Sequence, residues 1–349
     1  MKKKTLALLL TAALLCTGTV QYVSAENAET TETTETTNDA ADSTTTEDTI
    51  TDETTTEVGT CVAASGISKD SKGRMYIADR IHHVLYRRST SGKYTILAGT
   101  YDKSGKKTGT AENALFNSPW DVVAYGSGWA ISDSENHVIR LYKNGKVTTL
   151  AGAGKSGYKN AKGKSAKFNR PTGMAAGTNG EIYVADTGNN VIRKIDKNGK
   201  VTLYAGGKQG CASGSLKNAR FNEPTGLYYY KGTLYVADSG NHRICKIANG
   251  KVTTVAGSSK GVEGDKNASA LKARFSNPQE IYWYQNVMYI SDTGNGAVKC
   301  LSNGKVTTIV NAFSMDDGLA PAEPCGLMIY SGKLYVGDIF AEKLLEVER

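Results

Sequence analysis

The sequence predicts an all-β chain folded as a six-bladed β-propeller of four-stranded antiparallel blades, and three observations carry this prediction. A segment such as "YVADTGNNVIRKI" (residues 183–195) recurs six times, and each copy contains one aspartate. The aspartates lie 46 to 54 residues apart, at Asp79, Asp133, Asp186, Asp238, Asp292 and Asp338. A period near 50 residues indicates an array of one supersecondary unit. Asn-Gly pairs recur within the unit, and no amphipathic helix separates the copies.

Residues 168–206 show how one unit divides into strands. A first strand follows Pro171, Asn179-Gly180 leads into "EIYVAD", "TGNN" leads into "VIRKID", and Asn198-Gly199 leads into "VTLYAG". Asn-Gly favours the two-residue turn that joins antiparallel strands, because both turn positions need positive φ. The second strand is apolar on both faces, which is typical of a strand covered on both sides. Six such units around an axis form a propeller.

The N-terminus is expected to contain a targeting segment and a linker. Three lysines precede an apolar run from Leu6 to Leu15, and Val23-Ser24-Ala25 fits a cleavage site, so residues 1–25 are predicted to be a signal peptide. The run is shorter than the ~20 residues of a membrane span. We therefore expect a secreted, extracellular protein without a transmembrane anchor.

An acidic linker is predicted over residues 26–53, followed by the propeller over residues 54–349. Residues 26–57 contain 11 Asp or Glu, no Lys or Arg, and many Thr, a composition typical of disorder. Residues 58–349 then hold 39 Lys and Arg against 23 Asp and Glu, a net charge of +16. The folded part is thus strongly basic.

The ends of the chain are expected to meet in blade six. The sixth unit stops after its third strand, and "TTTEVGT" (residues 54–60) resembles the missing fourth strand. We predict that this segment completes the blade, which removes an exposed sheet edge. Cys61 and Cys325 align near the starts of neighbouring first strands, so a disulfide between them is predicted, provided that their Cα atoms lie within ~7 Å.

The line "FNEPTGLYYYKGTLYVADSGNHRICKI" (residues 221–247) resembles an NHL repeat, named for an Asn-His-Leu triplet. Asn136-His137 and Asn241-His242 keep its first two letters, and the resemblance extends over residues 55–349. It implies a propeller that binds other macromolecules. Related propellers include lyases with a histidine-bound metal and calcium-dependent lactonases, so fold alone does not choose a function.

The repeated aspartates and the histidines are predicted to be structural. An aspartate before a turn accepts backbone N–H bonds, which explains its presence in every unit. The four histidines fall in the turns between second and third strands, where they would need to converge on the axis to bind a metal. No Cys-x-x-Cys pair, nucleophile elbow or phosphate-binding glycine loop is present. We therefore predict no metal site, no cofactor and no catalytic residue.

A basic loop face is predicted on the side of the second-to-third-strand turns. The connections between blades are rich in Lys and Gly and are expected to emerge there, beside the turns. The candidate ligand-binding residues on this face are Lys155, Lys159, Lys162, Lys164, His137, Arg193, His242 and Arg243. Either the face is a solubilising surface, or it docks an extracellular protein or an anionic cell-surface polymer or glycan; nucleic acid is not expected outside a cell.

A second candidate site lies at the axis. Two residues after the opening proline, or its equivalent, the blades read Gly66, Asp121, Gly173, Gly226, Glu280 and Gly326. Blades two and five are opposed in a six-membered ring, so Asp121 and Glu280 are expected to face each other. The pair could hold a ligand amine or a cation such as calcium, with the glycines leaving room, or each carboxylate could simply bond nearby backbone.

Two functions therefore remain open. The first is a monomeric binding module that uses its basic loop face, and the second is a propeller enzyme of lyase or lactonase type that uses the axial mouth. A cluster of histidines and carboxylates at the axis would favour the enzyme. A broad basic or aromatic face would favour binding, which the sequence indicates more clearly.

Overall fold

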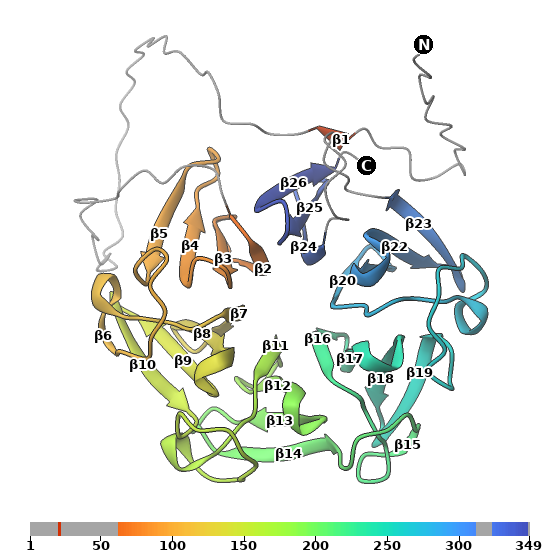
Figure 1. Ribbon diagram of the computed structural model, residues 1–349, viewed down its shortest axis with the longest axis horizontal. Coiled ribbons are helices and arrows are strands. Elements are labelled where there is room, and N and C mark those ends of the chain that lie inside the picture. The colour runs from red at the N-terminus through yellow and green to blue at the C-terminus, as the bar shows by residue number, and fades with distance from the viewer. Residues whose placement is uncertain (1–19, 22–61, 312–322, 348–349) are drawn as a thin grey trace, which may run out of the picture.

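The computed structural model describes residues 20–21, 62–311 and 323–347, and these form a ring of six antiparallel sheets around one axis (Figure 1). The first strands of the sheets contact one another in the order β2, β7, β11, β16, β20, β24 and back to β2. The predicted six-bladed propeller is confirmed. No helix in the described ranges is long and apolar enough to cross a membrane.

The strands of each blade follow one another from the axis outward. Blade 1 comprises β2 (Ala64–Lys69), β3 (Met75–Asp79), β4 (Val84–Arg88) and β5 (Tyr94–Ala98). Blade 2 comprises β7 (Pro119–Tyr125), β8 (Gly128–Asp133), β9 (Val138–Lys143) and β10 (Lys146–Ala151), with β6 (Gly109–Thr110) at its edge. Blade 3 comprises β11 (Pro171–Ala176), β12 (Ile182–Asp186), β13 (Val191–Ile195) and β14 (Val201–Gly206).

The other three blades repeat this order. Blade 4 comprises β16 (Pro224–Tyr230), β17 (Thr233–Asp238), β18 (Arg243–Ala248) and β19 (Lys251–Gly257), with β15 (Gly214–Ser215) at its edge. Blade 5 comprises β20 (Glu280–Tyr284), β21 (Val287–Asp292), β22 (Ala297–Ser302) and β23 (Lys305–Asn311). Blade 6 comprises β24 (Pro324–Tyr330), β25 (Lys333–Asp338) and β26 (Lys343–Val347). The only helical elements of the described residues are short 3-10 turns: η1 (Ala111–Asn113), η2 (Ser134–Asn136), η3 (Gly163–Ser165), η4 (Thr187–Asn189), η5 (Ser239–Asn241), η6 (Ala270–Lys272) and η7 (Thr293–Asn295).

The prediction that residues 54–60 close blade 6 stays a prediction, and the described residues place another N-terminal segment at its edge. Residues 54–60, predicted to be the fourth strand, lie outside the described residues. The structure instead pairs β1 (Val20–Gln21) with the outer edge of β26. The first and sixth blades are also joined by a hydrogen bond from Val62 N to Glu342 O of 2.9 Å.

The four described connections, into blades 2 to 5, start and end beside the second-to-third-strand turns, as predicted. Each of them also runs along the outer edge of the blade that it leads into, so the connections extend over the rim as well as over that face. β6 pairs with Lys146 at the start of β10, and β15 pairs with Lys251 at the start of β19. Isolated bridges Lys162–Lys200 and Ser269–Lys305 do the same for blades 3 and 5. The outer edge of a fourth strand carries backbone N–H and C=O groups that no other strand of its blade can bond, and the connection bonds some of them.

The apolar core is divided among the interfaces between neighbouring blades. Phe168 packs between blades 2 and 3 with Met174 and Val184, and Phe221 packs between blades 3 and 4 with Leu227 and others. Phe116 and Phe275 occupy the equivalent positions, and all four rings are fully buried. Since a buried Phe removes 150–250 Å² from water, each interface holds its blades together strongly.

Candidate functional site

The six repeated aspartates are buried structural groups, as predicted, but most of them bond a different partner from the one expected. Asp79 and Asp338 accept backbone N–H bonds from the turn that follows them. In blades 2 to 5 the Oδ1 atom instead accepts the N–H group that follows the buried ring, as from Asn169 to Asp186 at 2.7 Å. The aspartate therefore ties the start of the first strand to the end of the second.

A buried cation on the third strand neutralises four of these carboxylates. Arg193 Nη1 lies 2.7 Å from Asp186 Oδ2, and both side chains are fully buried. The equivalent pairs are Arg140–Asp133, Arg243–Asp238 and Lys299–Asp292. Burial raises the pKa of Asp186, while its hydrogen bonds and Arg193 act in the opposite direction.

The interpretation of Arg193 and Arg243 as ligand-binding residues of a basic face was therefore wrong. Besides its carboxylate, Arg193 donates to the carbonyl oxygens of Lys167 and Lys159, and its guanidinium lies 4.5 Å from the ring centroid of Tyr158. The sequence contained a signal for this, because Arg193 shares a strand face with the buried Val191 and Ile195.

His137 and His242 connect successive blades. Each occupies a left-handed turn position, with φ of 56° and 51°, and each Nδ1 accepts an N–H group of the next blade. The bonds come from Arg170 to His137 and from Asn277 to His242, both at 3.1 Å. Asn190 Oδ1 accepts the N–H of Glu223 at 2.8 Å in the same way. The histidine of the NHL triplet is thus explained by a hydrogen bond between blades. Burial lowers the pKa of His137.

The four candidate lysines are exposed but do not gather at one place. Lys155, Lys159, Lys162 and Lys164 all belong to the connection into blade 3. Lys155 lies near the end of β10, whereas Lys162 pairs with Lys200 at the opposite end of the blade. The lysines therefore form a stripe down the outer rim, rather than part of a face.

Cys325 is buried and forms no disulfide with any other cysteine that the structure describes. Its Sγ lies 3.3 Å from Ser65 O and 3.3 Å from Gln279 Oε1. Cys61 lies outside the described residues, so its pairing with Cys325 stays a prediction.

The glycines of the axial ring close the ring instead of opening it. A Cβ atom at Gly173 would lie less than 3 Å from Thr225 O, and one at Gly226 less than 3 Å from Gln279 O. A Cβ atom at Gly66 or at Gly326 would also lie less than 3 Å from an atom of the neighbouring first strand. The expectation that these glycines leave room for a ligand was wrong: they let the starts of the first strands touch.

The first strands separate toward their other ends, where a cavity of about 280 Å³ opens. In β16, for example, Pro224 to Leu227 are buried and the last three tyrosines are half-buried, and β20 shows the same trend. The cavity is lined by residues of all six first strands. It opens at the end of the ring opposite the aspartate turns, because first strands run away from those turns.

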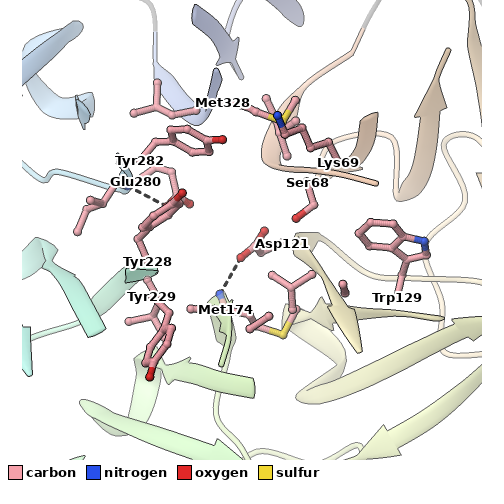
Figure 2. Close-up of a pocket in the computed structure, with 18 residues that line it drawn as sticks. Ser68, Lys69, Asp121, Trp129, Met174, Tyr228, Tyr229, Glu280, Tyr282 and Met328 are labelled. Carbon is pink, nitrogen blue, oxygen red and sulfur yellow. Dashed lines mark hydrogen bonds between the residues drawn. The ribbon is translucent and has the colours of Figure 1, made fainter. Parts of the chain in front are cut away.

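Asp121 and Glu280 both line this axial pocket, near its closed end (Figure 2). They come from β7 and β20, which are opposed in the ring. Asp121 Oδ1 accepts the N–H of Val122 and Oδ2 accepts that of Met174, both at 2.7 Å. Glu280 Oε1 accepts the N–H of Ile281 at 2.9 Å. The backbone bonding that was weighed as an alternative is thus present, yet both carboxylates still face the cavity.

The two axial carboxylates have no cationic partner among the described residues. Burial raises the pKa of Asp121 to about 7, against the effect of its backbone bonds. Burial, followed by the charge of Asp121, raises the pKa of Glu280 well above its usual value. Such perturbed groups in a cavity mark a candidate binding or catalytic site.

Aromatic and sulfur-containing side chains complete the wall, and they were not predicted from the sequence. Tyr228, Tyr229 and Tyr282 lie on the Glu280 side, and Trp129 lies on the Asp121 side (Figure 2). The signal was present in "LYYY" and "IYWY", which end two first strands with aromatic residues where blade 3 has "MAAG". Lys69 stands at the open end, where its Nζ lies 5.1 Å over the ring of Tyr330.

Neither the pocket nor the turns offers a ready metal site. Within the described parts of the chain, no three His, Cys, Asp or Glu side chains are grouped as metal ligands would be. The histidines lie at the other end of the ring from the opening of the axial pocket.

Comparison with known proteins agrees with the repeat structure. The family model of the NHL repeat matches residues 168–195 and 221–247. NHL repeat-containing protein 2 of Homo sapiens is 26% identical over 294 residues, which cover 70% of this chain and 40% of that protein. Protein SUPPRESSOR OF QUENCHING 1, chloroplastic, of Arabidopsis thaliana is 39% identical over 99 residues, which are 28% of this chain and 9% of that protein. The chain thus spans less than half the length of these relatives.

Solved structures share the fold at low sequence identity. An auxiliary nutrient binding protein from Bacteroides thetaiotaomicron superposes with a TM-score of 0.59 at 14% identity, covering 82% of this chain and 69% of that one. Virginiamycin B lyase from Staphylococcus aureus superposes with a TM-score of 0.52 at 12% identity, covering 82% of this chain and 95% of that one. A likeness at this identity shows the fold alone. The chain therefore carries NHL repeats, as the family model and these relatives show, on a six-bladed β-propeller.

Proposed function

We propose that the protein is a binding module whose axial pocket receives a small, positively charged ligand. The fold supports a binding or interaction role in general. The observation that carries the proposal is the presence of two buried carboxylates that have no cationic partner in the described part of the chain, at the closed end of an open cavity. Buried charges are normally paired, because an unpaired charge is costly to bury. A ligand cation would supply the missing partner.

The test compares the wild type with the double variant Asp121→Ala/Glu280→Ala. Thermal unfolding is followed with and without a panel of cationic probes: calcium, tetramethylammonium and a primary alkylammonium. The proposal expects at least one probe to raise the melting temperature of the wild type and to leave that of the variant unchanged. If every probe affects the two proteins equally, the axial site has no such function.

A second function, docking of an anionic macromolecule, is favoured by the lysine stripe on the rim. Lys155, Lys159, Lys162 and Lys164 are exposed, and no acidic residue occurs between Ala151 and Gly180. On a dextran sulfate column, the wild type is expected to elute at higher salt than a variant with all four lysines changed to serine, since counterion release makes such binding salt-dependent. Equal elution would contradict this second function.

We also propose that the mature protein acts outside the cell, on the basis of its N-terminal leader pattern. Catalysis of the lyase or lactonase type has less support. The histidines lie in the turns at the other end of the ring, where two of the candidate ligands, His137 and His242, accept backbone bonds. An enzyme of this type would have to use the axial carboxylates as its catalytic groups, whereas their expected role is to bind a cationic ligand.

A further inference from the structure

The axial pocket is built for one class of cation. We propose that it binds an organic ammonium ion, namely a primary amine on an apolar or aromatic body, with its ammonium group between Asp121 and Glu280. This inference rests on the proposed function and names the ligand that the pocket's walls select.

The donor set is too small for a metal ion. Asp121 already uses both oxygens on the N–H groups of Val122 and Met174, and Glu280 uses one oxygen on Ile281. Of the four carboxylate oxygens of the pair, Glu280 Oε2 alone accepts no hydrogen bond from the described residues. Calcium takes 6–8 oxygen ligands, and magnesium an octahedron. Two partly engaged carboxylates in an apolar cavity do not approach that number.

An ammonium group needs fewer oxygen acceptors than a metal ion. It carries three N–H donors, and a carboxylate offers about four lone-pair positions, so oxygens that already accept one bond can accept another. Glu280 Oε2 and the remaining lone pairs of Asp121 approach from opposed strands, which suits a small group held between them. The positive charge would also remove the repulsion between the two carboxylates, which no neutral ligand can do.

The walls above the carboxylates select an organic body. Met174, Leu227 and Met328 give an apolar surface, and Tyr228 and Tyr282 add aromatic faces. The two tyrosine rings are held in place, because their hydroxyls donate to Trp283 O at 3.3 Å and to Ile329 O at 3.5 Å. Aromatic faces attract cations as well as apolar groups. A cavity of about 280 Å³ limits the body to a small molecule.

Binding should be linked to the release of a proton. The other ionisable groups that line the pocket or lie beside the pair are Lys69 on β2, Cys325 on β24, Tyr228 and Tyr229 on β16 and Tyr282 on β20. Lys69 is directed over Tyr330, and burial raises the pKa of Cys325, Tyr228 and Tyr282 away from neutrality. The pKa of Asp121 is raised to about 7 and that of Glu280 well above its usual value, so the ammonium ion competes with a proton that the pair shares.

The experiment is isothermal titration of the mature protein with phenethylammonium, which keeps its charge at both about pH 6 and about pH 8. Affinity is expected to rise about tenfold from the lower to the higher pH, as one proton with a pKa near 7 ceases to compete. Titration in two buffers of different ionisation enthalpy should show proton release near neutral pH. The conservative variant Glu280→Gln should weaken binding at least tenfold and should reduce the number of protons released on binding. Glu223→Gln, an exposed matched control, should change neither the affinity nor the proton release.

The controls separate the ligand class from the proposed function. Phenethyl alcohol has the same body without the charge and should not bind measurably. If calcium, or a neutral hexose such as glucose, binds in a Glu280-dependent way while phenethylammonium does not, the pocket is a binding site but the ammonium proposal is wrong. If phenethylammonium binds equally to the wild type and to Glu280→Gln, its site lies elsewhere and the proposal is also wrong.

Discussion

Asp186 in blade 3 and Glu280 at the axis are both buried carboxylates, but they are surrounded in opposite ways. Asp186 accepts an N–H bond from Asn169 and an amide bond from Asn189, and it is paired with Arg193. Glu280 accepts one backbone bond and faces Asp121, which carries the same charge. The first arrangement is complete without a ligand and recurs around the ring. The second occurs once among the described residues, and it is neutralised only by a proton or by an incoming cation.

The largest loss of stability is expected when the cation is removed from the complete arrangement. Arg193→Ala leaves Asp186 as an unpaired buried charge and deletes two bonds to carbonyl oxygens. The expected loss is about 3–5 kcal/mol in the free energy of unfolding, measured by chemical denaturation. Arg170→Ala is the matched control, because the Arg170–Glu223 pair is about half exposed and such pairs contribute about 0–1 kcal/mol. Equal losses in the two variants would show that the buried pair contributes no more than the exposed one.

A second effect should come from the closed end of the axial ring. Gly226→Ala places a methyl group against Gln279 O, and the backbone of blade 5 cannot move away without shifting Glu280. Overpacking of this kind costs about 1–3 kcal/mol. Gly207→Ala is the control, since its nearest neighbour is the flexible end of Arg220 at 3.1 Å. A Gly226→Ala variant as stable as the wild type would contradict the account of the glycines as close-contact positions.

The third prediction concerns pH and only the axial pair. Because the folded pKa of Glu280 is raised, its burial costs nothing below its unfolded pKa, and stability falls as pH rises through the folded value. Glu280→Gln should therefore unfold at a higher temperature than the wild type at pH 8, whereas the difference should vanish near pH 4, below the unfolded pKa of about 4.3. Thermal melts across this range measure it. Glu223→Gln, an exposed carboxylate, should follow the wild type at every pH.

The smallest effect is expected at the bonds between blades. His137→Ala removes the acceptor for the Arg170 N–H and should cost about 0.5–1.5 kcal/mol. His137→Asn should recover most of this loss, because Asn190 performs the same task in the next blade and asparagine tolerates the left-handed backbone. If asparagine were no better than alanine, the bond would not be the reason for a polar residue at this position.

The sequence predicted the blades because their determinants are local. Asn-Gly at residues 144–145, 249–250 and 303–304 adopts positive φ at both positions, as the turn requires. The spacing of the repeats also predicted that Asp121 and Glu280 lie on opposed strands. The path of the connections could not be predicted, because it depends on an edge that exists only once a blade has formed. The fate of Arg193 was misjudged because its charge was weighed above its place on an apolar strand face.

The axial pocket was only half predicted for a related reason. Its closed end follows from the glycines, but their role depends on how closely neighbouring first strands approach, which is a property of the ring. The aromatic wall could have been inferred by comparing the last residues of the first strands. Its opening away from the turns could not, because it follows from the separation of the six strands along the axis.

The connections that run along the outer edges have a consequence for aggregation. In blades 2 to 5, β6, the Lys162–Lys200 bridge, β15 and the Ser269–Lys305 bridge occupy part of each outermost strand, so a second copy of the chain finds fewer free backbone groups there. Among the described residues, β5 of blade 1 has no strand or bridge on its outer side. An exposed strand edge is a template for pairing with another molecule. When the concentration is raised, the occupied edges of blades 2 to 5 are therefore expected to hinder edge-to-edge association between copies.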